Sequence, residues 1–302
     1  MDKIILVTGG SGLVGKSLKK IMPNAIYISS SNFDLTDENS VIKMFEKYRP
    51  SVIIHLAAKV GGIIDNIKYP YDYFTENILM NTLLLKYSLK YNVERFIGIL
   101  STCIYPDTVK EYPLSEDQLH DGPPTETNFS YGYSKRCLAV QIEAINKQHN
   151  TKYNYLIPCN LYGDNDKDDP NKSHFITSLI KKLYDANLNG DTEINLFGDG
   201  TPIRQFMHAD DLSKIIKLCV DNDITDNFNV ANDEIYTIDE MVNIGINVTN
   251  SSHLKIVYDT SKPNGQYRKD VSNKKLKEIF PNIKFIKLSE GIKKIYYDKI
   301  SK

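Results

Sequence analysis

The stretch KIILVTGGSGLVGKSLKK, residues 3–20, begins with a short apolar run and continues directly into glycines spaced GxxGxxG and a segment with helical periodicity. We expect a strand, a tight turn and a helix. Gly9 permits the turn, Gly12 lets a pyrophosphate approach the backbone, and Gly15 lets the helix pack closely on the strand. The helix N-terminus would then face the anion. The stretch therefore predicts a dinucleotide site.

Further apolar runs follow, and segments with helical periodicity separate them. The runs are AIYISS (25–30), SVIIHLAAK (51–59) and RFIGILST (95–102). A Leu-rich helical segment spans 77–91. Continuously apolar strands are typical of a parallel sheet buried on both faces, and their alternation with helices predicts a doubly wound α/β (Rossmann) fold. We expect an NADP-binding domain over 1–160 with a returning segment near 203–230, and a smaller C-terminal substrate-binding lobe over 161–302.

Ligands of such sheets bind at the carboxyl ends of the strands, so the residues there are candidates for cofactor contacts. No Asp or Glu ends the second strand, where a carboxylate would hold a free ribose 2′-hydroxyl, and this slightly favours NADP over NAD. The hydroxyls of Ser11, Ser29 and Ser30 would hold the 2′-phosphate; a serine-rich turn without that role explains them equally well. The expected contacts are Gly9, Ser11, Gly12, Leu13, Val14, Gly15, Ser29, Ser30, Asp34, Leu35, Ala57, Ala58 and Lys59.

A second stretch, Ser101–Lys135, begins with STCIYP and ends with YGYSK. STCIYP follows a buried strand and YGYSK opens a long helical segment, so we expect the two ends to meet in one site. They bring a hydroxyl (Ser101), a thiol (Cys103), a phenol (Tyr131) and an ammonium (Lys135). These groups can move protons around a carbonyl that lies beside a nicotinamide.

Tyr131 and Lys135 form a YxxxK pair one helical turn apart, so the phenol and the ammonium share a helix face. In a chain with 20 Tyr, chance gives about two such pairs, and a second one occurs at Tyr258 and Lys262. A proline directly after Lys262 argues against a continuing helix there. We expect Lys135 to lower the pKa of the Tyr131 phenol, ordinarily about 10, and the Ser101 hydroxyl to bind the same substrate oxygen.

The charge balance and the cysteines exclude several classes of protein. The formal net charge is -1, so no overall field draws the chain to nucleic acid or to an anionic membrane. The cysteines, Cys103, Cys137, Cys159 and Cys219, show neither CxxC spacing nor a disulfide framework. No apolar run approaches the roughly 20 residues that span a bilayer. We expect a cytoplasmic protein with no metal site, and packing roles for the last three cysteines and for His55.

With these motifs the chain resembles the extended short-chain dehydrogenase/reductases and, within them, the GDP-L-fucose synthase family. The resemblance covers nearly the whole chain. It rests on TGGSGLVG, HLAAKVGG, STCIYP, HDGPP, YGYSK, PCNLYG at 158–163, SHFI with His174, GDGTPIRQFMHADD and TSKPNGQYRK. The first and fifth of these motifs belong to the whole superfamily, whereas Cys103 in STCIYP, with His174 about seventy residues further on, is specific.

The resemblance implies a bifunctional enzyme that epimerises GDP-4-keto-6-deoxy-D-mannose at C3 and C5 and then reduces its C4 ketone with NADPH to give GDP-L-fucose. A ketone acidifies the hydrogens on both neighbouring carbons, so one carbonyl-polarising site can serve both reactions. Inversion needs a base and an acid on opposite faces of the ring, and the resemblance assigns these roles to Cys103 and His174. Without it, an inert packing thiol and a surface imidazole would explain the two residues better. The catalytic set is then Ser101, Cys103, Tyr131, Lys135 and His174.

The resemblance also extends the set of binding residues. Further cofactor contacts are expected from Tyr131, Lys135, Pro158, Asn160, Leu161 and His174. Substrate contacts are expected from Ser101, Cys103, Asn160, Arg204, Arg268 and Lys269. Arg204, one of only five arginines, suits a bidentate clamp on a sugar-nucleotide diphosphate. Arg268 and Lys269 would reach the same diphosphate or a ribose, or else belong to a solvated loop. We expect His208 and Asp211 to fix a turn.

Three further expectations concern the second half of the chain and its assembly. Most extended relatives have a proline after the YG of this segment, whereas this chain has Asp164, so we expect the loop 164–173 to be differently shaped or mobile. The Lys-rich tail beyond Asn273 predicts a capping helix. Exposed apolar positions on the helices at 77–91 and 134–148 suggest a homodimer through a four-helix contact.

Two alternative functions stay open. One is another nucleotide-sugar 4-epimerase or dehydratase of the same superfamily. The 4,6-dehydratases typically have an acidic pair in place of STC, and the presence of Cys103 instead argues against β-elimination. The other is a non-catalytic cofactor-sensing protein. Such proteins commonly lose Tyr131 and Lys135, so the presence of both argues against it.

Overall fold

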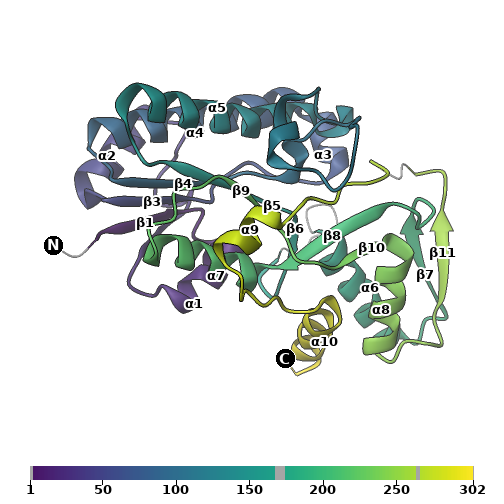
Figure 1. Ribbon diagram of the computed structural model, residues 1–302. Coiled ribbons are helices and arrows are strands. Elements are labelled where there is room, and N and C mark those ends of the chain that lie inside the picture. Colours follow the sequence, from purple (N-terminus) through teal and green to yellow (C-terminus); the bar gives the residue numbers. More distant parts are fainter. Residues whose placement is uncertain (1–2, 167–173, 263–265, 302) are drawn as a thin grey trace.

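The computed structural model describes residues 3–166, 174–262 and 266–301 (Figure 1). The first half contains β1 (Ile5–Thr8), α1 (Leu13–Ile21), β2 (Ile26–Ile28), α2 (Glu38–Tyr48), β3 (Val52–His55), α3 (Ile63–Lys68), α4 (Pro70–Lys90), β4 (Arg95–Ile99), the short 3-10 helices η1 (Thr102–Ile104), η2 (Glu116–His120) and η3 (Glu126–Asn128), and α5 (Phe129–His149). The second half contains β5 (Asn154–Pro158), β6 (Asn160–Tyr162), α6 (Phe175–Asn189), β7 (Glu193–Phe197), β8 (Ile203–His208), α7 (Ala209–Asp221), β9 (Phe228–Val230), β10 (Ile235–Thr237), α8 (Ile238–Val248), β11 (Lys255–Asp259), α9 (Lys274–Ile279) and α10 (Leu288–Ile300).

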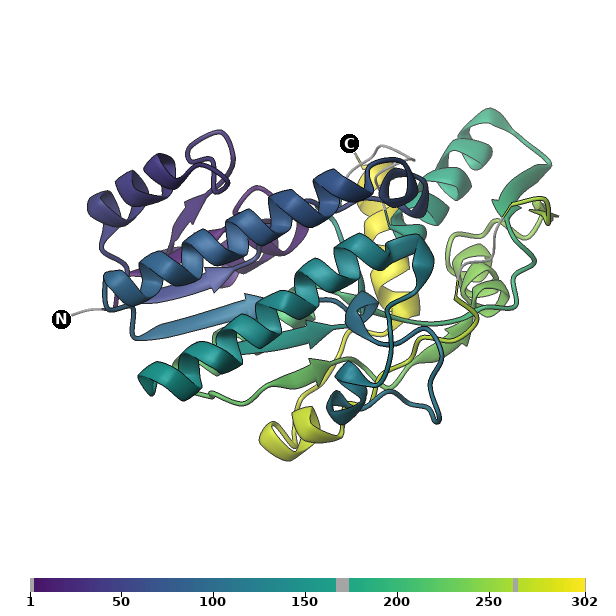
Figure 2. The same ribbon diagram turned by 90° about the horizontal axis from the view of Figure 1, so that it is seen from above.

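The largest sheet has six parallel strands in the order β2-β1-β3-β4-β5-β9. From β1 the chain moves to one side to form β2, and then crosses to the other side for β3, β4 and β5. The order therefore reverses between β1 and β3, which is where ligands of such sheets bind. Helices α2, α4 and α5 cover one face, and α1 and α7 cover the other (Figures 1 and 2). The predicted doubly wound parallel sheet is confirmed.

The strands form where the sequence is continuously apolar. All residues of β3, β4 and β5 are buried, as expected for a sheet with helices on both faces. The run SVIIHLAAK forms a strand only over Val52–His55, and its last residues, 56–59, form a loop after the strand. Helix α4 begins at Pro70, well before the expected start at 77, because proline is well tolerated in the first turn of a helix.

A smaller lobe follows β5 (Figure 1). It contains the three-stranded sheet β10-β8-β6, the two-stranded sheet β11-β7 and helices α6, α8 and α10 around a hydrophobic cluster of their own. Of the expected returning segment 203–230, α7 packs on α1 and β9 joins the large sheet, whereas β8 lies in the three-stranded sheet. The division at residue 160 stays a prediction. The tail forms two helices rather than one, because α9 packs beside β9 and α10 beside α6 and α8.

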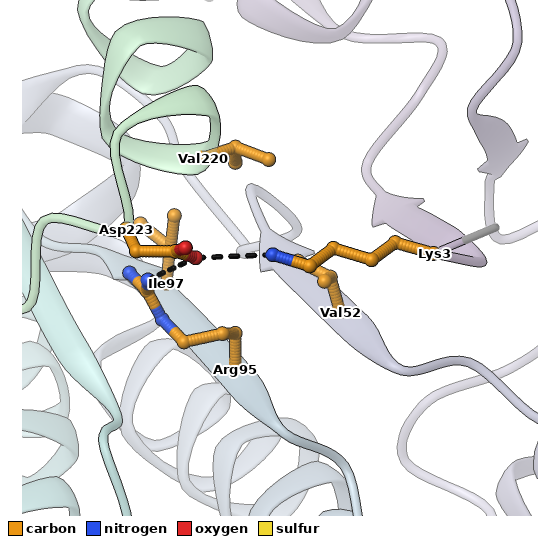
Figure 3. A pocket seen from close by; sticks show the side chains of 6 residues that line it. All are labelled: Lys3, Val52, Arg95, Ile97, Val220 and Asp223. Atoms are coloured by element: carbon orange, nitrogen blue, oxygen red, sulfur yellow. Dashed lines mark hydrogen bonds and ion pairs between the residues drawn. The ribbon is translucent and has the colours of Figure 1, made fainter. Parts of the chain in front are cut away.

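A small pocket lies at the amino-terminal ends of the strands of the large sheet, and ion pairs among its lining residues close it (Figure 3). Asp223 lies between Lys3, at 3.0 Å, and Arg95, at 3.3 Å. This edge is opposite to the one at which parallel sheets bind ligands, so we assign the pocket no role. Within the described ranges, no helix has the length and apolar character that a membrane span requires.

Candidate active site

The turn between β1 and α1 has the geometry that the glycine spacing predicts. Gly9 has a φ of +70°, and a Cβ built on it would lie 2.8 Å from the amide nitrogen of Ala57. A Cβ on Gly15 would overlap the Gly9 carbonyl oxygen and lie 2.7 Å from the Gly10 Cα. Gly12 is the N-cap residue of α1. The glycines therefore allow α1 to approach the end of β1 closely and bring the loop after β3, at Ala57, beside the turn.

His55 is a packed core residue, as expected. It is fully buried; its Nδ1 lies 2.8 Å from Thr8 Oγ1 and its Nε2 lies 2.9 Å from Asn81 Oδ1. Burial, with a smaller contribution from the Lys135 charge, lowers the pKa of His55 to about 3, so its ring is neutral. The Asn81 amide donates in turn to the Ser134 carbonyl oxygen at 3.4 Å. This network ties the ends of β1 and β3 to α4 and α5.

The serines after β2 hydrogen-bond to one another and to a nearby asparagine. Ser29 Oγ lies 2.8 Å from Ser31 Oγ, and the Ser29 amide donates to Asn32 Oδ1 at 3.2 Å. Asp34 accepts from the amide and the hydroxyl of Thr36 at 2.8 and 2.7 Å. These contacts form an exposed turn, and a 2′-phosphate contact at Ser29 and Ser30 stays a prediction.

Lys59, another expected cofactor residue, is engaged by carboxylates. Its Nζ lies 2.5 Å from Glu76 Oε1 and 3.7 Å from Asp72 Oδ2. Its backbone N–H donates to Asn77 Oδ1 at 2.9 Å. The loop after β3 is thus fixed to α4, and any cofactor contact of Lys59 stays a prediction.

Ser101, Cys103 and Tyr131 meet at the carboxyl end of β4. Ser101 is the N-cap residue of η1, and its Oγ accepts from the Cys103 amide at 3.3 Å. Helix α5, whose first turn carries Tyr131, packs against η1, and the Ser101 hydrogen bond and the Cys103 charge both act on the pKa of the Tyr131 phenol. The predicted meeting of STCIYP and YGYSK is therefore observed.

Two further residues of α5 hold this arrangement. A Cβ on Gly132 would lie 2.5 Å from the Cys103 carbonyl oxygen and 2.8 Å from Pro124 Cβ, so only glycine lets α5 come this close. The buried Arg136 guanidinium donates to the Ile104 carbonyl oxygen through Nε at 3.0 Å and through Nη2. Together they fix Cys103 beside the first turn of α5. Sequence reasoning missed both, although a glycine inside a helix and one of only five arginines were signals.

The expected effect of Lys135 on Tyr131 is wrong for this structure. Burial raises the pKa of the Tyr131 phenol well above its ordinary value, the nearby Cys103 raises it further, and the hydrogen bond from Ser101 offsets only a part. Lys135 is itself buried and donates to the Ile99 carbonyl oxygen at 2.8 Å. Burial lowers the pKa of Lys135 to about 8. The phenol is therefore protonated at neutral pH.

Cys103 has cationic neighbours that the sequence did not reveal. Lys269 Nζ donates to Cys103 Sγ at 2.9 Å, and Asn128 Nδ2 donates to it at 3.6 Å. Burial raises the pKa of the Cys103 thiol, but the Lys269 ammonium, the Ser101 hydrogen bond and the Arg204 charge outweigh burial, and the pKa is lowered overall. The thiol is thus biased toward thiolate.

The three expected diphosphate residues differ in what they contact. Arg204 lies in β8 and donates to the carbonyl oxygens of Ile203, at 2.8 Å, and Tyr267, at 3.4 Å. Arg268 binds the fully buried Asp270 in a bidentate pair, at 2.6 and 3.1 Å. Lys269 contacts the sulfur described above. Their roles as substrate contacts stay predictions, and part of their motif, residues 263–265, lies outside the described residues.

His174 is an exposed residue at the N-cap of α6. Its Nδ1 lies 3.0 Å from Asp166 Oδ2, and Asp166 also accepts from Thr177 Oγ1 at 2.7 Å. No hydrogen bond among the described residues joins His174 to Cys103 or Tyr131, so its place in the catalytic set stays a prediction. Most of the loop expected at 164–173 lies outside the described residues.

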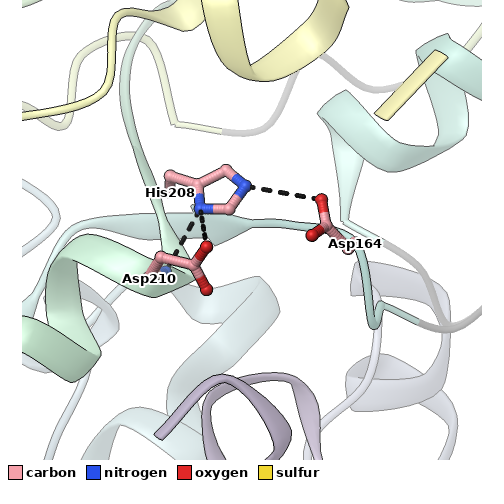
Figure 4. Close-up of side chains that lie close together, drawn as sticks. All are labelled: Asp164, His208 and Asp210. Carbon is pink, nitrogen blue, oxygen red and sulfur yellow. Dashed lines mark hydrogen bonds and ion pairs between the residues drawn. The ribbon is translucent and has the colours of Figure 1, made fainter. Parts of the chain in front are cut away.

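His208 fixes a turn, as expected. Its Nδ1 accepts from the Asp210 amide at 3.2 Å and caps α7, and its Nε2 faces Asp164 at 3.8 Å (Figure 4). The spacing of Asp164, His208 and Asp210 would suit a metal ion. However, Lys294 lies 2.8 Å and Lys20 3.5 Å from the Asp164 carboxylate, and these ammonium groups already balance its charge. We interpret the group as an ion-pair cluster.

The remaining expected residues also have defined positions. Pro158 ends β5, and Asn160 begins β6 and donates through Nδ2 to the Gln205 carbonyl oxygen at 3.2 Å. Asp211 accepts from the Ile286 amide at 2.9 Å and is buried, and burial raises its pKa to about 6. The thiols of Cys159 and Cys219 are buried, in agreement with packing roles, whereas Cys137 is partly exposed.

The fold and the glycine turn define a doubly wound dinucleotide-binding protein. The chain belongs to the NAD dependent epimerase/dehydratase family, whose model matches residues 5–231. It is similar to the GDP-L-fucose synthase of Dictyostelium discoideum, with 36% identity over 96% of this chain and 93% of that protein. Its identity to the GDP-L-colitose synthase of Yersinia pseudotuberculosis is 35%, over 96% of each chain. The crystal structure of a GDP-L-fucose synthetase from Naegleria fowleri bound to NADP matches with a TM-score of 0.88 and 29% identity, covering 100% of this chain and 96% of that one.

Proposed function

We propose that this protein is an NADPH-dependent GDP-sugar epimerase-reductase that converts GDP-4-keto-6-deoxy-D-mannose to GDP-L-fucose. The observation that carries the proposal is the meeting of Ser101, Cys103 and Tyr131 at the carboxyl end of β4. This edge of the sheet also holds the glycine turn. The name of the relative at 36% identity supports the choice of substrate.

The residues of the β1–α1 turn fit a dinucleotide. Gly9 and Gly15 leave a cradle that a Cβ would fill, and the N-cap residue Gly12 has no side chain, so the N–H groups at the start of α1 are left for a phosphate. We propose that the turn holds the pyrophosphate, with Tyr131 and Lys135 at the nicotinamide end. NADPH supplies the hydride for the C4 carbon when it is bound.

The protonated Tyr131 suits a ketone that must accept a proton. Its O–H and the Ser101 hydroxyl would both donate to the C4 oxygen, which stabilises the enolate formed when a neighbouring carbon loses its hydrogen. Tyr131 would then protonate the same oxygen in the reduction step. The high pKa of the phenol keeps this proton in place until the oxygen becomes strongly basic.

The thiol and the imidazole are the proposed proton carriers for the two inversions. Cys103 would act on one face of the sugar ring and His174 on the other. The Asp166 carboxylate holds His174 through Nδ1, at 3.0 Å, so Nε2 is the atom that would transfer a proton. The residues of the smaller lobe, Arg204 among them, would hold the nucleotide diphosphate.

The experiment is an NADPH oxidation assay with GDP-4-keto-6-deoxy-D-mannose. We expect NADPH absorbance to fall in proportion to the sugar consumed, and NADH to be used more slowly. A purified, folded protein that binds NADPH and oxidises none of it with this sugar would refute the assignment.

A second candidate remains within the same class, since the identity to a GDP-L-colitose synthase is 35%. Activity on the colitose precursor at a higher kcat/KM than on GDP-4-keto-6-deoxy-D-mannose would favour it. A 4,6-dehydratase is disfavoured because those enzymes typically have an acidic pair in place of STC, whereas this chain has the Cys103 thiol, which Lys269 contacts.

We further propose a homodimer. Large apolar side chains of α4 and α5 are exposed, among them Phe74, Leu79, Phe129 and Val140. These two long helices lie side by side on one face of the molecule (Figure 2). Pairing them with a second copy would bury these side chains in a four-helix contact.

We also propose a cytoplasmic setting and a division of labour between the two lobes. Cys103 must stay reduced to carry a proton, and a reducing compartment keeps it so. The large sheet, with residues 1–160 and the returning α7 and β9, would bind NADPH. The lobe from 161 onward would bind the sugar nucleotide.

A further inference from the structure

Lys269 is an almost fully buried lysine whose hydrogen bond is made to a sulfur atom. Lys269 is 8% exposed, and its Nζ donates to Cys103 Sγ at 2.9 Å. The two residues are 166 positions apart in the sequence. A buried ammonium is costly unless an acceptor compensates for its lost hydration. An ionised sulfur compensates for it better than a neutral thiol does.

The backbone around Lys269 is held on two sides, so the contact is not a chance rotamer of a loose loop. The Leu114 amide donates to the Asp270 carbonyl oxygen at 2.9 Å, on one side. The Ile203 amide donates to the Tyr267 carbonyl oxygen at 2.8 Å, on the other. The segment thereby bridges the loop after β4 and strand β8, and Lys269 projects from it toward the sulfur.

The other groups that face Cys103 favour an anion as well. Arg204 of β8 adds a second positive charge, and Asn128 donates to the sulfur at 3.6 Å. Ser101 hydrogen-bonds to Cys103, and the Tyr131 phenol beside it is protonated and uncharged. Two cations and neutral hydrogen-bonding groups face the sulfur, and among the described residues none of the groups that shift its pKa is a carboxylate.

We propose that Lys269 is a positioning residue for Cys103: with Arg204, it holds the sulfur as a thiolate in the ligand-free protein, so that Cys103 enters the reaction as the base. This proposal rests on the proposed function, because a thiolate at Cys103 serves as a base only if the enzyme removes a proton from the sugar. It also replaces the expectation that Lys269 contacts the diphosphate.

The chemical step is balanced without any further reactant. The thiolate takes a hydrogen as a proton from a carbon next to the C4 ketone, so a C–H bond breaks and an S–H bond forms. The electron pair of the C–H bond moves into the enolate, whose oxygen accepts hydrogen bonds from Tyr131 and Ser101. The Lys269 ammonium loses its anionic partner at this moment, and the thiolate forms again when the proton leaves the sulfur.

The test measures the alkylation of Cys103 by iodoacetamide as a function of pH, with the protein free of substrate. Mass spectrometry of the Cys103 peptide separates it from the other three cysteines. For the wild type we expect the rate to reach half its maximum below the ordinary thiol pKa of about 8.5. A midpoint at or above that value would overturn the proposal, whatever the variants show.

Substitution of the lysine then tests its part. Lys269→Met removes the charge and keeps the length of the side chain, and we expect the midpoint to rise by about one pH unit or more. Lys269→Arg should keep most of the wild-type midpoint. Lys262→Met, at an exposed lysine seven residues earlier in the same segment, is the matched control and should change nothing. Equal midpoints for Lys269→Met and wild type would refute the role of Lys269.

Kinetics with the sugar nucleotide separate this role from substrate binding. Lys269→Met should exchange the sugar hydrogens with solvent at least about tenfold more slowly near neutral pH, with KM close to wild type. A raised KM with unchanged kcat would mean that Lys269 binds the diphosphate, and the proposal would fail. If the wild type exchanges no hydrogen although its thiolate is present, the proposed function fails and the ion pair stands.

Discussion

Replacing Gly15 by alanine should loosen the cofactor turn by pushing α1 away from β1. The Cβ of alanine would overlap the Gly9 carbonyl oxygen and would lie 2.7 Å from Gly10 Cα and 2.8 Å from Gly10 C. All three are backbone atoms of the turn, so no side chain can rotate away. The first turn of α1 has to move outward, and its N–H groups move with it.

The magnitude follows from two opposing effects. Overpacking costs about 1–3 kcal/mol, and alanine gains about 1 kcal/mol over glycine in a helix. Because three backbone atoms are involved, we expect the upper end of that cost, and a net loss of about 2 kcal/mol in the free energy of unfolding. With an unfolding entropy of about 2.1 cal/mol/K per residue, this lowers the Tm by about 3 °C. A lost amide–phosphate hydrogen bond should raise the Kd for NADPH at least about tenfold.

Two glycine variants serve as controls. Among the described residues, a Cβ on Gly12 would meet only the Gly9 carbonyl oxygen, at 3.3 Å, so Gly12→Ala should change the free energy of unfolding by less than about 1 kcal/mol. It should still weaken NADPH binding, because its methyl group stands where the pyrophosphate approaches. Gly122→Ala, with its nearest contact at 3.4 Å, should change neither quantity.

The assays are urea unfolding followed by circular dichroism, since the chain has no Trp, and NADPH titration followed by nicotinamide fluorescence. If Gly15→Ala unfolds at the wild-type urea concentration and binds NADPH with the wild-type Kd, the close packing of α1 on the turn does not create the cofactor site.

Four other predictions concern the site, the core and the assembly. Tyr131→Phe should lower kcat for NADPH oxidation by on the order of 10²–10⁴ while NADPH binding stays unchanged; activity that survives would remove the phenol from the mechanism. Asp270→Asn should lower the free energy of unfolding by about 2 kcal/mol, because it replaces a charged, bidentate acceptor; an unchanged urea midpoint would contradict this. Burial raises the pKa of Asp211 to about 6, so between about pH 4 and pH 6 the folded chain retains a proton that the unfolded chain releases, and the free energy of unfolding of the wild type should fall as the pH rises through this range. Asp211→Asn should lose this contribution to the pH dependence. Identical pH dependences of the urea midpoint for the two proteins would refute it. Val140→Asp combined with Leu79→Asp should convert a dimer into a monomer in sedimentation, and a wild type that is already monomeric would reject the homodimer.

The features that could be predicted from the sequence are those that a short stretch determines. The turn at Gly9 and the packing at Gly15 follow from spacing alone, because both act within one strand–turn–helix unit. The packed position of His55 followed from its place inside an apolar run. Its neutral ring follows from the burial that the structure shows. The meeting of Ser101 with Tyr131 followed from the position of one at a strand end and the other at a helix start.

The features that could not be predicted depend on depth and on distant contacts. The YxxxK spacing places Lys135 near Tyr131, but the Lys135 ammonium donates to the Ile99 carbonyl oxygen, a contact that the spacing does not report. Burial has the largest effect on the pKa of the Tyr131 phenol, and the spacing does not report burial either. The contact between Lys269 and Cys103 joins residues 166 positions apart, and no local pattern reports such a pair.

The most direct test of the whole account is an exchange experiment in deuterated water with GDP-4-keto-6-deoxy-D-mannose and no NADPH, read by nuclear magnetic resonance of the sugar. We expect the wild type to introduce deuterium at C3 and C5, and Cys103→Ser to introduce none while it still binds NADPH. A wild-type protein that leaves both carbons unlabelled would contradict the epimerase-reductase assignment.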